Sequence, residues 1–234
     1  MKRATVISLF ILTLAMPAMA TDDAMVRASR FDEALVTDRP DAAEASVTVG
    51  ANRFQVETGI GYTYDKSEAV TTKTFGMPTL LRYGIIDAVE ARVEGEIFNH
   101  HLAPDAAAQT GFTDIAFGMK LHVTNGGGLI PSFGVLANLS APTGNEEFSS
   151  NGWEPTLKFL ADWELPAGFG LGTNIGFDVP ARLVIGEQFS RFLYAAALGR
   201  GIPGVEERLR IFIESAGAVA MQEGKPVEHQ LDTG

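Results

Sequence analysis

Four residues have the side chains of a serine hydrolase: His122, Ser132, Asn138 and Ser140. Such an enzyme needs a serine nucleophile, a histidine base and an Asn or Asp that orients the histidine. All four lie on the same face of two neighbouring segments of alternating hydrophobicity. The sequence has no Gly-x-Ser-x-Gly nucleophile elbow, which weakens this hypothesis. We therefore predict that the protein is not an enzyme, and we keep a barrel hydrolase as the weaker alternative.

Two other motifs are candidates for binding a metal ion or a nucleotide. His100, His101 and Asp105 carry metal-binding side chains on one loop, but adjacent loop histidines usually point into solvent. The Asn-Gly-Gly-Gly run at 125–128 lacks the lysine and the helix of a phosphate-binding loop, so it indicates a turn. The absence of cysteine excludes a thiolate zinc site and a cysteine nucleophile. We predict no metal and no cofactor.

Nine charged residues alternate with apolar ones and are predicted to line the interior of a barrel. They are Glu90, Arg92, Glu94, Glu96, Asp114, Lys120, Glu154, Lys158 and Asp162. Charged linings select ions in pores, and this excess of acids would give a conducting lumen a preference for cations. The alternative is a lumen whose charges pair with one another, fill the space and let nothing pass.

The charged residues Asp38, Arg39 and Asp41 precede the first alternating segment. One hypothesis makes them part of a periplasmic segment that folds into the barrel mouth and pairs with the inward charges. The alternative is an N-terminal lead whose charges cap the first turn or lie in water. Both readings stay open at the level of sequence.

These side chains must be positioned by strands, because hydrophobicity alternates with a period of two residues along most of the chain. In residues 89–98, Glu90, Arg92, Glu94 and Glu96 share one face, whereas a helix would scatter them around its circumference. The expected strands are 54–64, 70–83, 89–98, 113–123, 129–140, 153–164, 169–178, 189–199 and 209–216, with a tenth beginning near residue 227.

Glycines, aromatics and loop lengths favour a membrane barrel over a secreted β-sandwich. The non-apolar positions hold charges or glycines, and glycine suits a crowded barrel interior better than a solvated strand face. Aromatic pairs such as Trp153 with Trp163 fit the two interfacial girdles of an outer-membrane barrel. Connections after the first hairpin alternate between short and long, as periplasmic turns and extracellular loops do. We predict an all-β, antiparallel, up-and-down transmembrane β-barrel of about 10–12 strands when complete.

The N-terminus and the charge set the expected compartment and partners. The chain begins like a secretory signal peptide: Lys2 and Arg3 are followed by a short apolar run and then by a small-residue cleavage pattern at 17–20. The predicted organisation is a signal peptide at 1–20, a periplasmic segment at 21–51 and a barrel domain at 52–234. A formal net charge of −11 argues against nucleic-acid binding. The expected partners are outer-membrane lipids, a small-molecule solute, periplasmic chaperones and the barrel-insertion machinery.

Several segments resemble a family of outer-membrane barrels described as transporters or as proteins of the meta-pathway of phenol degradation. The most specific are Thr37-Asp38-Arg39-Pro40-Asp41 and Leu80-Leu81-Arg82-Tyr83-Gly84. Further similar stretches are 53–59, 113–120, 139–144 and 192–194. The resemblance implies passive passage of small molecules, aromatic or hydrophobic ones among them, across the outer membrane of a Gram-negative bacterium. The alternative function is a non-conducting structural or adhesion barrel.

Members of that family continue through further strands beyond the point that matches residue 232. A sheet with an open edge is not tolerated in lipid, because its backbone groups would lack partners. We therefore expect the barrel domain of this chain to be C-terminally incomplete, without its last strands; the alternative is a closing strand that comes from elsewhere.

Overall fold

The structure is a computed structural model of the chain, and it describes residues 3–17, 37–38, 43–66, 71–104, 106–181, 190–202, 210–221 and 227–233. Its strands are β1 (Arg3–Pro17), β2 (Arg53–Lys66), β3 (Thr71–Ile86), β4 (Val89–Leu102), β5 (Gln109–Gly111), β6 (Ile115–Thr124), β7 (Ser132–Ala141), β8 (Glu154–Leu165), β9 (Phe169–Asp178), β10 (Arg191–Gly201), β11 (Arg210–Ala220) and β12 (Val227–Thr233). A single 3-10 turn, η1 (Pro166–Gly168), joins β8 to β9 within this described part.

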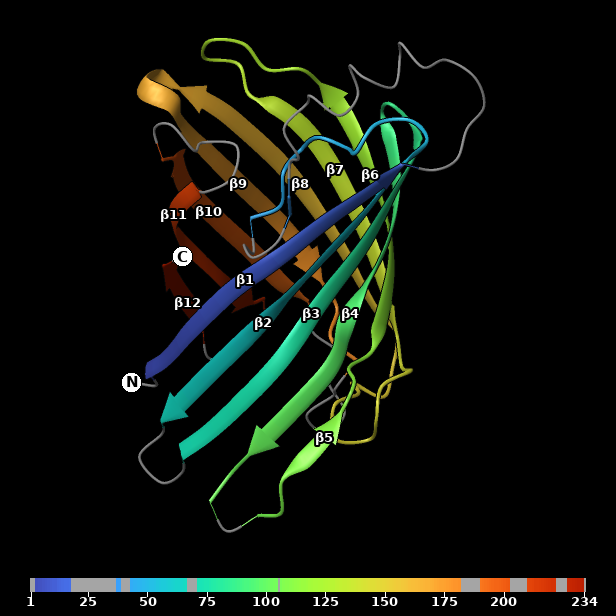
Figure 1. Ribbon diagram of the computed structural model, residues 1–234, viewed down its shortest axis with the longest axis vertical. Helices are drawn as coiled ribbons and strands as arrows, with labels where there is room; N and C mark the ends of the chain where they lie inside the picture. The colour runs from blue at the N-terminus through green and yellow to red at the C-terminus, as the bar shows by residue number, and fades with distance from the viewer. Residues whose placement is uncertain are drawn as a thin grey trace.

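The described strands form one antiparallel sheet of 12 strands. Each strand pairs with the next along the chain, except that the short β5 lies off the path and pairs with β4. The sheet curls so that its two end strands, β1 and β12, come close together, with β12 near the N-terminal end of β1 at the left of Figure 1. This confirms the predicted all-β, antiparallel, up-and-down fold, in the form of a curled half-barrel.

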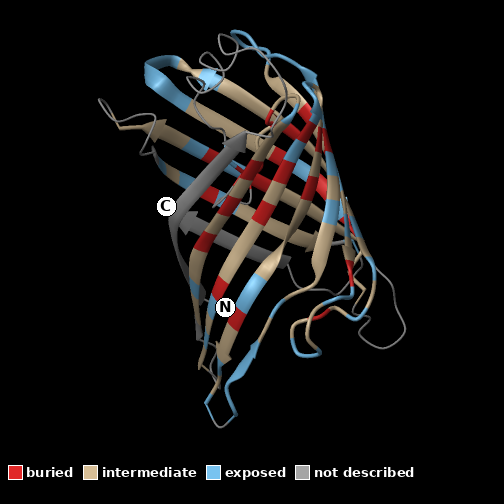
Figure 2. Ribbon diagram, turned by 45° about the vertical axis from the view of Figure 1, so that its right-hand side comes forward, coloured by how far each residue is buried: buried red, intermediate tan, exposed pale blue. Residues whose placement is uncertain are grey.

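The two faces of the sheet carry opposite kinds of side chain. Large apolar residues of the outer face are exposed, among them Phe117 at 53% and Met119 at 56%. Among the described residues, buried polar or charged side chains outnumber buried apolar ones. A water-soluble domain shows the reverse distribution. Figure 2 shows the buried positions as a band that crosses the strands.

The alternation read from the sequence explains this arrangement. In β6 the outward residues Phe117, Met119 and Leu121 are exposed, while Lys120 between them is fully buried. Successive side chains of a strand point to opposite faces, so one apolar set and one polar set follow from the sequence order alone. In the described residues no helix is long and apolar enough to cross a bilayer.

The connections alternate in length as predicted. Short turns at 87–88, 125–131 and 166–168 lie at one end of the sheet, and the longer connections at 103–114 and 142–153 lie at the other. Only four residues separate β2 from β3, so the first hairpin is the exception that the sequence already indicated.

Residues 3–17, inside the predicted signal peptide, form β1 in the structure of this 234-residue chain and pair with β2. Cleavage after Ala20 would remove β1 and leave that edge of β2 without its neighbour. Cleavage and the domain boundaries at 20 and 51 stay predictions.

Candidate functional site: an N-terminal strap inside the sheet

Residues 37–38 and 43–50, here called the strap, cross the inner face of the curled sheet. Figure 1 shows their blue trace running inside the sheet near the short-turn end. Through hydrogen bonds, ion pairs or packing, the strap contacts every strand of the path from β2 to β11. These contacts come from Glu57, Arg82, Glu90, Arg92, Lys120, His122, Ser132, Lys158, Asp162, Asn174, Ala195, Ala197 and Glu214.

Ala43 and Glu44 of the strap are fixed to β8, β9 and β11. The Ala43 N–H donates to Glu214 Oε1 at 2.5 Å, and Lys158 Nζ donates to Glu44 Oε1 at 3.0 Å. The Asn174 side-chain amide, oriented with its oxygen toward the Glu44 N–H, accepts from it at 2.7 Å and donates to the Glu44 carbonyl at 3.1 Å. Backbone and side chain of Glu44 are thus both bound to the inner wall.

Ser46 anchors the middle of the strap. Its N–H donates to Asp162 Oδ2 at 2.5 Å, and its hydroxyl donates to Ser132 Oγ at 2.7 Å. Its carbonyl faces His122 Nδ1 at 3.2 Å. The strap passes so close to β7 that a Cβ atom at Gly134 would lie 2.7 Å from the Ser46 carbonyl oxygen. Glycine is needed there because another backbone approaches closely.

The last part of the strap is bound near the turn between β3 and β4. The Val49 N–H donates to Glu90 Oε2 at 2.9 Å, and the Thr48 hydroxyl donates to the Asp87 carbonyl at 2.5 Å. A Cβ atom at Gly84 would overlap the carbonyl oxygen of Gly50. This second close approach lets the chain turn directly from the strap into β2.

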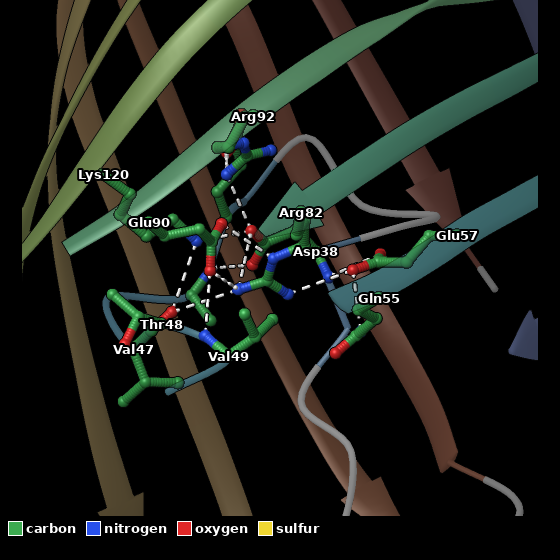
Figure 3. A network of polar contacts seen from close by, with 12 residues as sticks. Asp38, Val47, Thr48, Val49, Gln55, Glu57, Arg82, Glu90, Arg92 and Lys120 are labelled. Atoms are coloured by element: carbon green, nitrogen blue, oxygen red, sulfur yellow. Dashed lines mark hydrogen bonds and ion pairs between the residues drawn. The ribbon is translucent and has the colours of Figure 1, made fainter. Parts of the chain in front are cut away.

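Asp38 lies at the centre of a buried ion cluster, shown in Figure 3. Its Oδ2 atom accepts from Arg92 Nη1 at 2.8 Å and from Lys120 Nζ, and it lies 3.5 Å from Arg82 Nη2. Its backbone N–H donates to Glu57 Oε2 at 2.9 Å. Asp38 and these three cations are almost completely shielded from solvent.

Arg82 holds the other acids of the cluster. Its Nε and Nη2 atoms donate to the two oxygens of Glu90 at 2.8 and 2.9 Å, and its Nη1 atom donates to Glu57 Oε1 at 3.0 Å. A guanidinium fork matches a carboxylate in this two-bonded geometry. Arg92 pairs in addition with Glu44 Oε2 at 2.6 Å and with Glu94 Oε2 at 3.6 Å, so the three cations face five carboxylates: Asp38, Glu44, Glu57, Glu90 and Glu94.

The cluster keeps Asp38 ionised. Burial by itself would raise the pKa of Asp38, but Lys120, Arg82 and Arg92 outweigh it and hold that pKa below its ordinary value. At neutral pH the strap therefore presents a carboxylate to the inner wall. Of the three charged residues predicted in this segment, Arg39 and Asp41 lie outside the described residues.

The nine predicted lining residues divide into four groups. Glu90, Arg92 and Lys120 belong to the ion cluster, and Lys158 and Asp162 bind the strap. Glu94 accepts from Asn138 Nδ2 at 2.7 Å, and Glu96 packs over Gly76 of β3.

Asp114 and Glu154 lie toward the long-loop end and bind loops instead. Asp114 accepts from the N–H groups of Gly144 and Ser150, each at 2.8 Å, and Glu154 accepts from the Ala181 N–H at 2.8 Å. Burial by itself would raise the pKa of the Asp114 carboxyl. The two backbone hydrogen bonds and a third one from the Ser150 hydroxyl outweigh it and lower that pKa below its ordinary value. The sequence did not indicate this loop-binding role.

The sequence missed Arg82 and Glu57 as members of the cluster, although signals for both exist. Glu57 lies on the polar face of segment 54–64, and Arg82 lies in the Leu-Arg-Tyr-Gly stretch. The alternation of β3 is interrupted where its register with β4 shifts between Gly76 and Pro78, since proline lacks the N–H that a ladder needs. That interruption hid the direction in which Arg82 points.

The residues considered for hydrolase chemistry are engaged otherwise. His122 Nε2 lies 3.0 Å from Asn125 Oδ1, and its other ring nitrogen faces the strap. The Ser132 hydroxyl donates to the Thr124 carbonyl at 3.2 Å and accepts from Ser46. In this arrangement His122 is directed at the strap and not at a serine hydroxyl.

His100 and His101, expected on a loop, lie in β4 instead, where they pair with β3 and β5, and both are directed at threonines. His100 Nδ1 lies 2.8 Å from Thr110 Oγ1, and His101 Nδ1 lies 2.9 Å from Thr74 Oγ1. Asp105 lies outside the described part of the chain. Within that part, no three His, Asp or Glu residues are grouped so that they could hold a metal ion. The glycine run at 125–128 belongs to a turn closed by a bridge between Gly127 and Ile130.

Fold and site together define a class: an up-and-down antiparallel β-sheet curled around a charged interior that the chain's own N-terminal segment crosses. Residues 37–206 match the family described as "Putative MetA-pathway of phenol degradation". The match begins at the strap and covers most of the sheet, and the chain belongs to this family. Neither the curated proteins nor the solved structures yielded a match.

Proposed function

We propose that this protein is an outer-membrane barrel for the passive passage of small molecules, and that it is a transporter and not an enzyme. The observation that carries the proposal is the inverted distribution of side chains. An apolar outer face such as that of β6 suits lipid, and a charged inner face suits a lumen. The family description makes aromatic compounds the first solutes to test.

The proposal places the protein in the outer membrane of a Gram-negative bacterium. A predicted signal peptide would direct export, and periplasmic chaperones with the barrel-insertion machinery would deliver the chain to the membrane. The short-turn end, where the strap enters, would face the periplasm, because outer-membrane barrels have short periplasmic turns.

Passage requires the strap to leave part of the interior. Liposome swelling with the full protein and with a variant lacking residues 21–50 tests this. We expect slow swelling for the full protein and at least tenfold faster swelling for the variant. If neither protein raises the swelling rate above that of protein-free vesicles, the transport proposal fails. An equal rate for both would end the idea that the strap obstructs the lumen.

A non-conducting structural barrel is the second candidate, and the ion cluster favours it. Paired buried charges and a bound strap fill space and hold a sheet in shape without leaving a path for solutes. The same swelling measurement separates the candidates, because a structural barrel stays closed when residues 21–50 are removed.

A further inference from the structure

We propose that Arg82, Arg92 and Lys120 form a carboxylate-binding site on the inner wall, that Asp38 occupies it in this structure, and that a small carboxylate solute competes with Asp38 for it. The inference rests on the proposed transport function and names its class of solute. It also gives the strap a role as an internal competitor.

The site is built by three neighbouring strands. Arg82 lies on β3, Arg92 on β4 and Lys120 on β6, and these strands are adjacent in the sheet. All three cations converge on one atom, Asp38 Oδ2, and their side chains are 0–1% exposed. Glu90 and Glu57 fix the Arg82 guanidinium by three hydrogen bonds, so the cation is already oriented before any ligand binds.

The charge balance shows that the site needs an anion. The strap carboxylates Asp38 and Glu44 pair with four wall cations, Arg82, Arg92, Lys120 and Lys158. Without the strap, these four cations form ion pairs with three described wall carboxylates, Glu57, Glu90 and Glu94, so positive charge is left in excess. Among the described residues, Asp38 is the only carboxylate that forms an ion pair with Lys120. Buried positive charge in excess is costly, so departure of the strap creates a demand for another carboxylate at this place.

The strap is bound by contacts that a solute and water can replace. Its attachments are hydrogen bonds and ion pairs, and its described buried apolar residues are only Ala43 and Val49. Hydrogen bonds exchanged for bonds to water contribute little net stability each. Because the strap is part of the chain, its high effective concentration makes it a strong competitor despite these modest contacts.

Competition couples ligand binding to release of the strap. If a carboxylate solute binds only when Asp38 leaves, then each event favours the other by the same factor. A solute of the correct class would therefore open its own path, whereas a neutral molecule of equal size would not.

Calorimetric titration of the full, detergent-solubilised chain tests the site with benzoate as probe and benzamide as its neutral match. We expect Asp38→Asn to bind benzoate at least tenfold more tightly than the wild type, since the competing charge is gone. Adding Lys120→Gln to Asp38→Asn should abolish binding, while adding Lys73→Gln, an exposed cation on β3, should not change it. Equal binding of benzoate and benzamide, or no gain from Asp38→Asn, would overturn the proposal.

A disulfide lock gives a second measurement that does not depend on changing the cluster. The chain has no cysteine, and the hydroxyls of Ser46 and Ser132 are 2.7 Å apart, so Ser46→Cys with Ser132→Cys would tie the strap to β7. We expect the oxidised protein to bind benzoate at least tenfold more weakly than the reduced protein, with each single-cysteine variant unaffected by oxidation. Equal affinity in both redox states would contradict competition by the strap.

The outcomes distinguish this inference from the transport proposal. Titration requires no flux, so benzoate binding without vesicle swelling supports the site and refutes transport. Swelling without selective benzoate binding supports transport and refutes the site.

Discussion

At the scale of single residues, the most informative feature is the convergence of Arg82, Arg92 and Lys120 on Asp38. These side chains are buried and mutually paired, so each depends on the others for its electrostatic compensation. Replacing a whole buried ion network by apolar groups is often neutral, but removing one partner leaves the opposite charge unpaired. The cluster should therefore be sensitive to single substitutions.

The first prediction concerns Arg82. Arg82→Met leaves Glu57 and Glu90 without their main cation, and we expect a loss of about 3–5 kcal/mol in the free energy of unfolding. Urea unfolding of the protein in detergent, followed by tryptophan fluorescence, measures it. Lys73→Met is the control on the same strand, where an exposed cation should matter by less than about 0.5 kcal/mol. A loss of similar size in both variants would refute a special role for Arg82.

The second prediction concerns pH. Because the cations lower the pKa of Asp38 in the folded chain relative to the unfolded one, the stabilisation from Asp38 is complete above the unfolded value of about 4. It is lost as the pH falls below that value toward the folded pKa. The difference in unfolding free energy between wild type and Asp38→Asn should thus be constant from pH 5 to 8 and shrink below about pH 4. A difference that grows on acidification would have the wrong sign.

At the scale of elements, the strap and the sheet fit each other through backbone contact. Gly134 on β7 and Gly84 on β3 lie where the strap passes, and neither position has room for a Cβ atom. The strap in turn bonds to strands from β2 to β11, so it spans the curvature of the sheet. Its docking depends on strand spacing as much as on charge.

The third prediction tests this fit. Gly134→Val should push the Ser46 region away from β7 and increase the rate at which a cysteine at position 46 reacts with a polar maleimide by at least tenfold. Gly127→Val is the matched control, because a Cβ atom there meets nothing within 4 Å. An unchanged labelling rate in Gly134→Val would contradict the prediction that the Ser46 region needs the space beside Gly134.

At the scale of the whole molecule, the inverted distribution of side chains is the dominant feature. The outer face of β6 exposes Phe117, Met119, Leu121 and Val123 in succession, and the inner face carries buried charge. Such an outer face costs free energy in water and gains it in hydrocarbon. The curled sheet thus suits a lipid environment better than an aqueous one.

The fourth prediction compares two depths on β6. Met119→Arg, in the middle of the strand, should destabilise the protein in lipid vesicles by about 2–4 kcal/mol, whereas Val123→Arg, near its end, should cost about 0–1 kcal/mol. Urea titration in vesicles, read by the heat-modifiable shift on gels, measures both. Equal costs at the two positions would argue against a membrane-spanning β6.

The strands were largely predictable, and the site only partly so. Segments such as 169–178 coincide with their strands, because alternation is a local property of consecutive residues. Leu136 and Leu160, which the sequence assigned to neither face, are almost fully and fully buried, respectively, and Leu136 is paired with Lys158 across the ladder. The two leucines show that hydrophobicity alone does not place every apolar residue on the outer face.

The sequence by itself determined which side chains share a face, since the pleat of a strand depends only on the order of residues. It also indicated that the charges of 89–98 lie together and that the segment around Asp38 precedes the alternating segment that forms β2. Only the tertiary structure decided which charges meet. Asp38 pairs with Lys120, 82 residues away, and Ala43 bonds to Glu214, 171 residues away. Such contacts depend on the curl of the sheet and on the path of the strap across it, and no local pattern encodes either one.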